Sequence, residues 1–210
     1  MIELDGRLTL TFEDVEGQRL ALVDDGGVGP ASPWEKSTVP PEHQIRGLGP
    51  IVLNVHDLSR TAMVLQGVMN MRHVRDYAAA DAKAEVRVFA MGEGGSAAEL
   101  HVIEQKNLAV ARQGAGGVHH VAFRTPDETQ YHGWTQRLRE LGIPNSGEID
   151  RFYFRSLYFR EPNGILFEIA TDGPGFATDE PMEKLGEKLA LPPFLEGRRA
   201  AIEAGLKPIT

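Results

Sequence analysis

The sequence predicts an α+β fold built from repeated modules, each with one strand, one helix and three further strands. The same order of apolar patterns and turn signals occurs at 47–105 and again at 117–171. Residues 4–23 indicate two strands around a turn, and 12–17 aligns in frame with 159–164, as expected for the last two strands of a further copy. A connector rich in glycine and proline follows this partial copy.

These patterns divide the chain into five parts. We expect the closing strands of a truncated module at 1–25, a linker at 26–45, a first full module at 46–106, a second full module with the metal-site residues at 117–172, and a helical C-terminal tail at 173–210. In the tail the pattern predicts helices at 180–189 and at about 195–205. Its alternating charges are typical of a solvated surface.

The two full modules are expected to contain the same elements. In the first, a strand from Ile51 runs into a helix that ends near Val68, and strands follow at 71–77, 84–91 and 97–105. In the second, a strand at 118–125 precedes a helix that Asp127 can cap, with Gln130 at capping-box spacing and Gly142 at its end. Three strands then follow, at about 147–151, 153–160 and 165–171.

The composition narrows the possible functions. With 30 acidic against 22 basic residues the net charge is −8, which disfavours nucleic-acid binding through a basic surface and favours a small-molecule substrate. The chain has no cysteine, so a metal would be held by nitrogen and oxygen. The sequence lacks the long apolar run of a membrane helix and the N-terminal layout of a signal peptide, so we expect a cytoplasmic location and no membrane partner.

His120 and Glu168 are the candidate metal ligands. Strand alternation places His120, Ala122 and Arg124 on one face of the strand at 118–125. Glu168 falls in the middle of an apolar strand, where an ionised carboxylate is costly without a cation, donors or a proton. An imidazole and a carboxylate suit iron(II), manganese(II) or zinc. Alternatively, His120 is a hydrogen-bonded core histidine and Glu168 pairs with Arg155 or Arg160.

A repeated module with a histidine in its first strand and a glutamate in its last resembles the vicinal oxygen chelate superfamily. This superfamily includes glyoxalase I, extradiol dioxygenases and the bleomycin- and fosfomycin-resistance proteins. The string Phe-Arg-Glu-Pro-Asn-Gly-Ile-Leu-Phe-Glu at 159–168 looks like its closing-strand signature. More narrowly, the chain resembles the C-terminal half of bacterial ring-cleaving dioxygenases of the hydroquinone type, in the stretches 118–124, 150–162, 171–176 and 185–193.

This resemblance implies cup-shaped mixed sheets and a mononuclear iron(II), less often manganese(II) or another divalent metal. In the family the metal is held by two histidines and one glutamate, and it keeps open positions for an aromatic diol and dioxygen. By resemblance His120 and Glu168 are ligands. His119, Arg151 and Tyr158 match positions that orient substrate, stabilise a bound phenolate and pass protons. Tyr158 could instead be a core tyrosine and Arg151 a charge at the rim. Candidate substrate-binding residues in the matching strings are Arg124, Phe154 and Phe176.

The second histidine ligand of the family has no counterpart in this sequence. In the family it comes from the opening strand of the first of four modules. The first full module of this chain does not supply it either, because Pro50 stands opposite His120. His101 is an outside candidate; His56 fits a turn, and His43, His73 and His132 fit the surface. We therefore expect another subunit to complete the site, either in a homodimer or through a separate chain that supplies the complementing N-terminal half. The other interpretations are a non-catalytic ligand-binding remnant and an isomerase or lyase of the glyoxalase type.

Overall fold

The computed structural model describes residues 1–80, 83–114 and 117–208, and the chain divides into two compact units. Unit 1 comprises Met1–His120 together with Arg160–Leu166. Unit 2 comprises Val121–Phe159 and Phe167–Thr210. The short segment Arg160–Leu166 contains a turn of the second module, so the modules seen in the sequence and the compact units do not coincide at this point.

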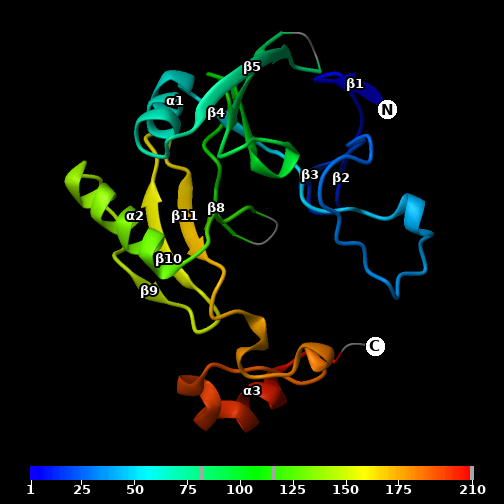
Figure 1. Ribbon diagram of the computed structural model, residues 1–210, viewed down its shortest axis with the longest axis vertical. Coiled ribbons are helices and arrows are strands. Elements are labelled where there is room, and N and C mark those ends of the chain that lie inside the picture. Colours follow the sequence, from blue (N-terminus) through cyan, green and yellow to red (C-terminus); the bar gives the residue numbers. More distant parts are fainter. Residues whose placement is uncertain (81–82, 115–116, 209–210) are drawn as a thin grey trace. The chain divides into compact units, whose positions relative to one another are not determined.

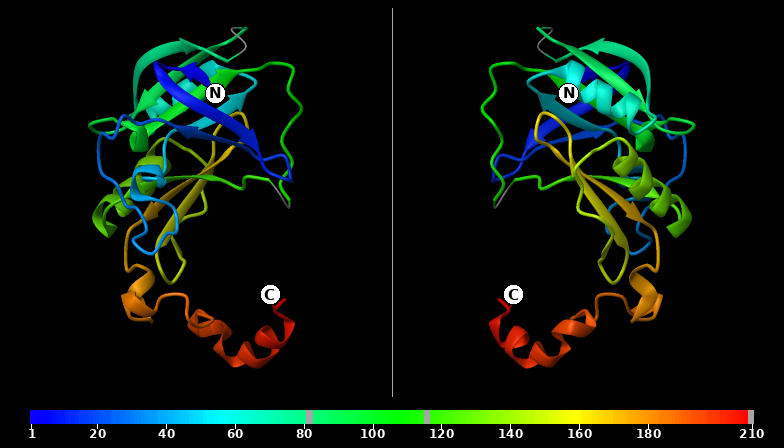
Figure 2. Two further views of the ribbon diagram at one scale, coloured as in Figure 1. Left: turned by 90° about the vertical axis from the view of Figure 1, so that its right-hand side faces the viewer. Right: turned by 90° about the vertical axis from the view of Figure 1, so that its left-hand side faces the viewer.

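Unit 1 contains a four-stranded mixed sheet covered by one helix. Its strands are β4 (Ile51–Val55), β5 (Arg72–Ala78), β6 (Glu85–Ala90) and β7 (Glu99–Glu104), in the order β4-β7-β6-β5. Strands β4 and β7 are parallel and the other pairs are antiparallel. Helix α1 (Leu58–Gly67) lies against this sheet (Figures 1 and 2). Asp57 caps the helix by accepting hydrogen bonds from the backbone of Ser59 and Arg60.

A separate three-stranded antiparallel sheet also belongs to unit 1. It consists of β1 (Ile2–Leu4), β2 (Arg7–Glu13) and β3 (Arg19–Val23), in the order β1-β2-β3. Strand β1 was not expected from the sequence. Asp5 and Gly6 join it to β2 with φ values of 52° and 70°, which are the two left-handed residues of a tight hairpin turn.

Unit 2 repeats the four-stranded sheet with its helix. The elements are β8 (Val121–Thr125), α2 (Glu128–Glu140), β9 (Ile149–Asp150), β10 (Arg155–Arg160) and β11 (Leu166–Thr171). The strand order is β8-β11-β10-β9, and β8 and β11 are parallel (Figure 1). Asp127 caps α2 as predicted, accepting a 2.8 Å hydrogen bond from the backbone of Gln130. The buried residues of this unit include Tyr131, Leu138, Leu157, Phe167 and Ile169.

Three expected elements differ from the structure. Strand β8 begins at Val121, where the ladder with β11 starts at Phe167, so His120 lies just before the strand and not in its middle. The helix expected at 180–189 is a single 3-10 turn, Met182–Lys184, because Pro181 precedes it and Gly186 has a φ of 82°. The expected last helix is a 3-10 turn, Pro193–Arg198, followed by α3, Arg199–Gly205.

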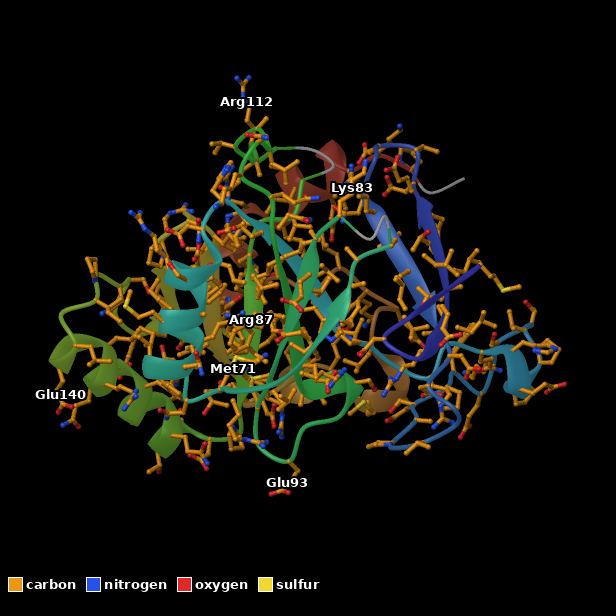
Figure 3. The ribbon with its side chains drawn as sticks, turned by 90° about the horizontal axis from the view of Figure 1, so that it is seen from above. Met71, Lys83, Arg87, Glu93, Arg112 and Glu140 are labelled. Carbon is orange, nitrogen blue, oxygen red and sulfur yellow. The ribbon has the colours of Figure 1, made fainter. Side chains whose placement is uncertain are left out.

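The remaining 3-10 turns are Pro41–His43, Ser96–Ala98 and Phe176–Thr178. Glu93, in the turn after β6, and Glu140, at the end of α2, have exposed side chains (Figure 3). Within the described part of the chain, no helix has both the length and the apolar character required to cross a membrane.

Candidate functional site

Glu168 lies in the middle of β11 and is almost completely buried. Its side chain is 2% exposed, and it stands opposite Ala122 in the parallel ladder with β8. Because side chains alternate along a strand, Phe167 and Ile169 point into the core of unit 2 and Glu168 points to the other face. There the hydroxyl of Ser156 donates a hydrogen bond to Oε1 of Glu168. A donor therefore compensates part of the cost of burying this carboxylate.

The two arginines considered as alternative partners of Glu168 bind other groups. Arg155 donates to Glu128 at 2.7 Å, and its Nη1 lies 3.2 Å from Oδ2 of Asp150. These carboxylates raise the pKa of Arg155. Arg160 donates to the carbonyl oxygen of Gly164 at 2.8 Å. Arg155 therefore links β10 to the start of α2 and to β9, and Arg160 binds the turn at Gly164.

Tyr158 and Arg151 add further polar groups to the sheet face that carries Ser156 and Glu168. Tyr158 is two residues from Ser156 on β10, so the two side chains share the sheet face to which Glu168 belongs. The guanidinium carbon of Arg151 lies 5.4 Å from the centre of the Tyr158 ring, which is a cation–π contact. We call Ser156, Tyr158, Glu168 and Arg151 the polar face of unit 2.

His119 and His120 form a pair at the end of unit 1. Their Nδ1 atoms are 2.9 Å apart, so one ring donates a hydrogen bond to the other. The carbonyl oxygen of His119 accepts a 2.9 Å hydrogen bond from the side chain of Gln113. His120 is half-buried and His119 is exposed. A histidine whose Nδ1 is fixed by a hydrogen bond has the arrangement that is usual for a ligand coordinating through Nε2.

The three candidate substrate-binding residues make different contacts. Arg124 forms a largely exposed ion pair with Asp172, which raises the pKa of Arg124. Phe154 is half-buried, and its carbonyl oxygen accepts a 2.8 Å hydrogen bond from the backbone of Arg151. Phe176 is 67% exposed and its ring lies 5.5 Å from that of Tyr153. The hydroxyl of Tyr153 donates to Asp179, which raises the pKa of Tyr153.

His101 occupies in β7 the position that Glu168 occupies in β11. Leu100 pairs with the first residue of β4, and Phe167 pairs with the first residue of β8. His101 directly follows Leu100 in β7, and Glu168 directly follows Phe167 in β11. His101 is 5% exposed, and burial lowers its pKa. Its Nδ1 lies 3.0 Å from the hydroxyl of Tyr77 and its Nε2 lies 3.3 Å from Glu99. Since a carboxylate only accepts, Nε2 carries the proton in this arrangement.

A charged cluster surrounds His101. The ligand atoms of Asp5, Glu99 and His101 lie within 4.8 Å of one another, which is a spacing that a metal ion could bridge. Arg75, however, binds both carboxylates: Nε donates to Asp5 at 2.9 Å and Nη1 donates to Glu99 at 2.8 Å. This guanidinium lowers the pKa of Glu99 to about 2. An arginine therefore supplies the positive charge at this position of the first module.

The other histidines lie where the sequence placed them, at a turn and on the surface. His56 Nδ1 is 3.2 Å from the carbonyl oxygen of Lys106, close to the start of α1. His73 lies 2.8 Å from Asp76, and His132 lies 2.7 Å from Glu148. His43 is exposed in the linker.

Two features of the site were missed by reading the sequence. Ser156 could have been found, because alternation along β10 places it on the same face as Tyr158. The cluster of Asp5, Arg75 and Glu99 around His101 gave no local signal, since Asp5 lies 70 residues from Arg75 along the chain. Such contacts depend on how sheets come together and not on a motif.

The fold and the polar face define a class of protein: a repeated strand–helix–three-strand architecture with a buried carboxylate in a closing strand. The family model of the Glyoxalase/Bleomycin resistance protein/Dioxygenase superfamily matches residues 47–169. The chain belongs to this superfamily and has the vicinal oxygen chelate fold. Membership implies a divalent metal.

The most informative relatives are bacterial. "Putative ring-cleaving dioxygenase MhqA" of Bacillus subtilis is 48% identical over 97% of this chain and 65% of its own length. A chlorohydroquinone/hydroquinone 1,2-dioxygenase of Sphingobium indicum is 29% identical over 91% of this chain and 59% of its own. A crystal structure of a "putative dioxygenase" from Bacillus subtilis superposes with a TM-score of 0.85 at 34% identity, covering all of this chain and 64% of that one. The chain thus spans less than two thirds of these relatives.

Proposed function

We propose that this chain is the metal-binding part of a ring-cleaving dioxygenase that acts on an aromatic diol of the hydroquinone or catechol type. The observation that carries the proposal is Glu168, a carboxylate that is 2% exposed on the face of a sheet opposite its core. The names of the relatives support the reaction class. We further propose that the reaction is of the extradiol or hydroquinone type. The proposed metal is iron(II), with manganese(II) as the second candidate.

His120 and Glu168 are the proposed metal ligands. His120 lies just before β8, two residues along the chain from Ala122, which is the ladder partner of Glu168. The donor set fits a divalent metal of the first row, because it joins an imidazole whose Nδ1 is hydrogen-bonded with a carboxylate that Ser156 orients. A bound metal would hold diol and dioxygen side by side and let electrons pass between them.

The remaining residues are proposed to handle the substrate and its protons. When His120 binds the metal through Nε2, its Nδ1–H would donate to Nδ1 of His119, and the Nε2–H of His119 would then donate a hydrogen bond to an oxygen of the diol and orient it. The hydroxyl of Tyr158 would donate a hydrogen bond to a diol oxygen, and Arg151 over the Tyr158 ring would stabilise negative charge on that oxygen. Arg124, Phe154 and Phe176 would contact the ring and its substituents.

A third protein ligand is proposed to come from another polypeptide. In the first full module Pro50 stands opposite His120, so this module offers no second histidine at that position. A homodimer or a complementing N-terminal half would each supply the missing donor.

A cytoplasmic location, expected from the sequence, is also part of the proposal, and cell fractionation tests it.

Metal analysis of two matched variants tests the metal site. Glu168→Gln should abolish binding of iron(II) and manganese(II) after anaerobic reconstitution. Glu161→Gln is the control, because Glu161 is also 2% exposed but accepts hydrogen bonds from Thr61 and Ile165 as a structural group. That variant should keep its metal. Equal metal content in both variants would contradict the assignment of Glu168.

Oxygen consumption tests the reaction class. The reconstituted chain, with the partner that completes it, should take up dioxygen when a substituted hydroquinone or catechol is added. Turnover of a substrate without oxygen uptake would instead indicate an isomerase or lyase of the glyoxalase type. A folded chain that binds no divalent metal would indicate a ligand-binding remnant.

A further inference from the structure

A chain of hydrogen bonds links helix α2 to Glu168. The hydroxyl of Tyr131 on α2 donates to the carbonyl oxygen of Ser156 at 2.6 Å, and it accepts from the backbone of Ile149 at 3.1 Å. The hydroxyl of Ser156 in turn donates to Oε1 of Glu168. Tyr131 and Ser156 are fully buried, so these contacts are shielded from water, where hydrogen bonds are electrostatically stronger. We call Tyr131 and Ser156 the supporting pair.

The Tyr131 hydroxyl holds the sheet at one defined point. Ile149 on β9 and Ser156 on β10 are register partners. The phenol oxygen accepts from the N–H of Ile149 and donates to the carbonyl oxygen of Ser156, so it ties this pair to α2 (Figure 1). A tyrosine side chain has only two rotatable torsions and is therefore a stiff spacer between a helix and a strand. The backbone from which the Ser156 hydroxyl reaches Glu168 is consequently fixed by the helix.

The first module has neither member of the supporting pair, and it also has no carboxylate at the position of Glu168. Thr61 takes in α1 the place that Tyr131 takes in α2, each four residues after the capping aspartate. His101 takes the place of Glu168, and its partner in the β6–β7 ladder is Val88, which has no hydroxyl. The module therefore folds without these hydrogen bonds, and they accompany the buried carboxylate of the second module.

We propose that Ser156 and Tyr131 are positioning residues that hold Glu168 in the orientation in which it binds the metal. This inference rests on the proposed function, because it takes Glu168 as a ligand. Ligating carboxylates are commonly hydrogen-bonded to groups that orient them, and loss of such a partner typically weakens metal binding about 10- to 100-fold. Ser156 acts on the carboxylate directly, and Tyr131 acts through the backbone of Ser156. Helix α2 thereby sets the geometry of a site to which it contributes no proposed ligand.

Manganese(II) titration of three variants tests the supporting pair. Each is measured in the assembly that binds the metal in the parent protein, at the same protein concentration. Ser156→Ala should raise the dissociation constant at least about tenfold, and Ser156→Thr, which restores a hydroxyl, should return it to within about threefold of the parent value. Tyr131→Phe keeps the ring and removes the hydroxyl, so it should raise the dissociation constant by about three- to tenfold.

Thr135→Val is the matched control on the same helix. Thr135 is buried, and its hydroxyl donates to the carbonyl oxygen of Tyr131 at 3.2 Å, so the variant loses a buried hydrogen bond but keeps the Tyr131 hydroxyl. It should lower the unfolding temperature of the metal-free protein, as Tyr131→Phe does, yet keep the manganese(II) dissociation constant within about twofold. The electron paramagnetic resonance spectrum of bound manganese(II) should change in Ser156→Ala and not in Thr135→Val, because it reports the arrangement of the ligands and not global stability.

The same titration separates the supporting pair from the metal site itself. Glu168→Gln should abolish manganese(II) binding. If it does, while Ser156→Ala and Tyr131→Phe keep the dissociation constant and the spectrum of the parent, Glu168 remains a ligand and the supporting role is wrong. An equal loss of affinity in Thr135→Val and Tyr131→Phe would also contradict that role, because affinity would then follow stability alone. Retained binding in Glu168→Gln would overturn the proposed metal site, and the supporting role with it.

Discussion

Glu161 and Glu168 show how one residue type is used in two ways within a single hairpin. Both side chains are 2% exposed. Glu161 accepts hydrogen bonds from the hydroxyl of Thr61 at 2.8 Å and from the backbone of Ile165 at 3.0 Å, so it fastens the turn to α1. Glu168 has Ser156 as a donor and lies on a face with Tyr158 and Arg151. Burial alone therefore does not distinguish these two carboxylates, whereas the polar groups around each of them do.

The pair Arg75–Glu99 predicts a specific dependence of stability on pH. The hydrogen bond from Arg75 lowers the pKa of Glu99 from 4.5 to about 2. A carboxyl with a depressed pKa in the folded state binds fewer protons there than in the unfolded chain, so its stabilising effect is complete above pH 4.5 and is lost as the pH falls towards 2. We expect Glu99→Gln to be less stable than the parent at neutral pH and to show a smaller loss of stability on acidification.

Urea unfolding at several pH values between about 6 and 3 measures this difference. The stability gap between parent and Glu99→Gln should narrow as the pH falls. Glu140→Gln serves as the control, since Glu140 is an exposed residue at the end of α2 (Figure 3). Parallel profiles for the parent and Glu99→Gln would contradict the proposed linkage.

At the scale of elements, the turn at 161–164 connects two modules. The side chain of Asn163 accepts from the backbone of Asp57 at 3.0 Å and donates to the Asp57 carbonyl oxygen at 2.9 Å. Asp57 is the N-cap of α1, so this turn of the second module holds the start of the helix of the first. The sequence signal Pro162-Asn163-Gly164 thus marks both a tight turn and a contact between repeats.

Gly164 provides a test of backbone strain in that turn. Its φ is 92°, and a Cβ added there would meet nothing within 4 Å, so the cost of an alanine is conformational and not steric packing. We expect Gly164→Ala to lower the free energy of unfolding by about 1–2 kcal/mol. Gly133→Ala is the matched control in open space inside α2, and it should raise stability by roughly 0.5–1 kcal/mol. Chemical denaturation measures both, and equal effects would contradict the role of the left-handed backbone.

The elements that could be predicted from the sequence are those with local signals. Helix α2 begins at the predicted cap, because Asp127 binds a backbone amide three residues away, and Asp57 caps α1 in the same way. The helix expected at 180–189 is limited to one turn by Pro181 and Gly186. The candidate ligands His120 and Glu168 stay predictions. The Arg75 cluster was beyond sequence reasoning, since it unites Asp5 with β5 and β7 through tertiary contacts.

For the molecule as a whole, the proposed metal site links function to assembly. The proposed site takes two ligands from this chain, His120 and Glu168, and a third from another polypeptide. A two-ligand site alone would hold a divalent ion weakly, and the binding free energy of the complete site would also stabilise the complex. The metal and the partner should therefore promote each other's binding.

This linkage predicts that metal affinity depends on protein concentration. In the homodimer form of the proposal, the apparent dissociation constant for manganese(II) should fall as the chain is concentrated from about 1 to 100 μM, and the mass from light scattering should rise towards that of a dimer when the metal is added. In the form with a complementing half, neither change should occur until that polypeptide is supplied. Glu168→Gln should show no response to manganese(II) in either case. A strictly monomeric chain that binds manganese(II) tightly at micromolar concentration would show that all ligands come from one polypeptide, and it would contradict a shared site.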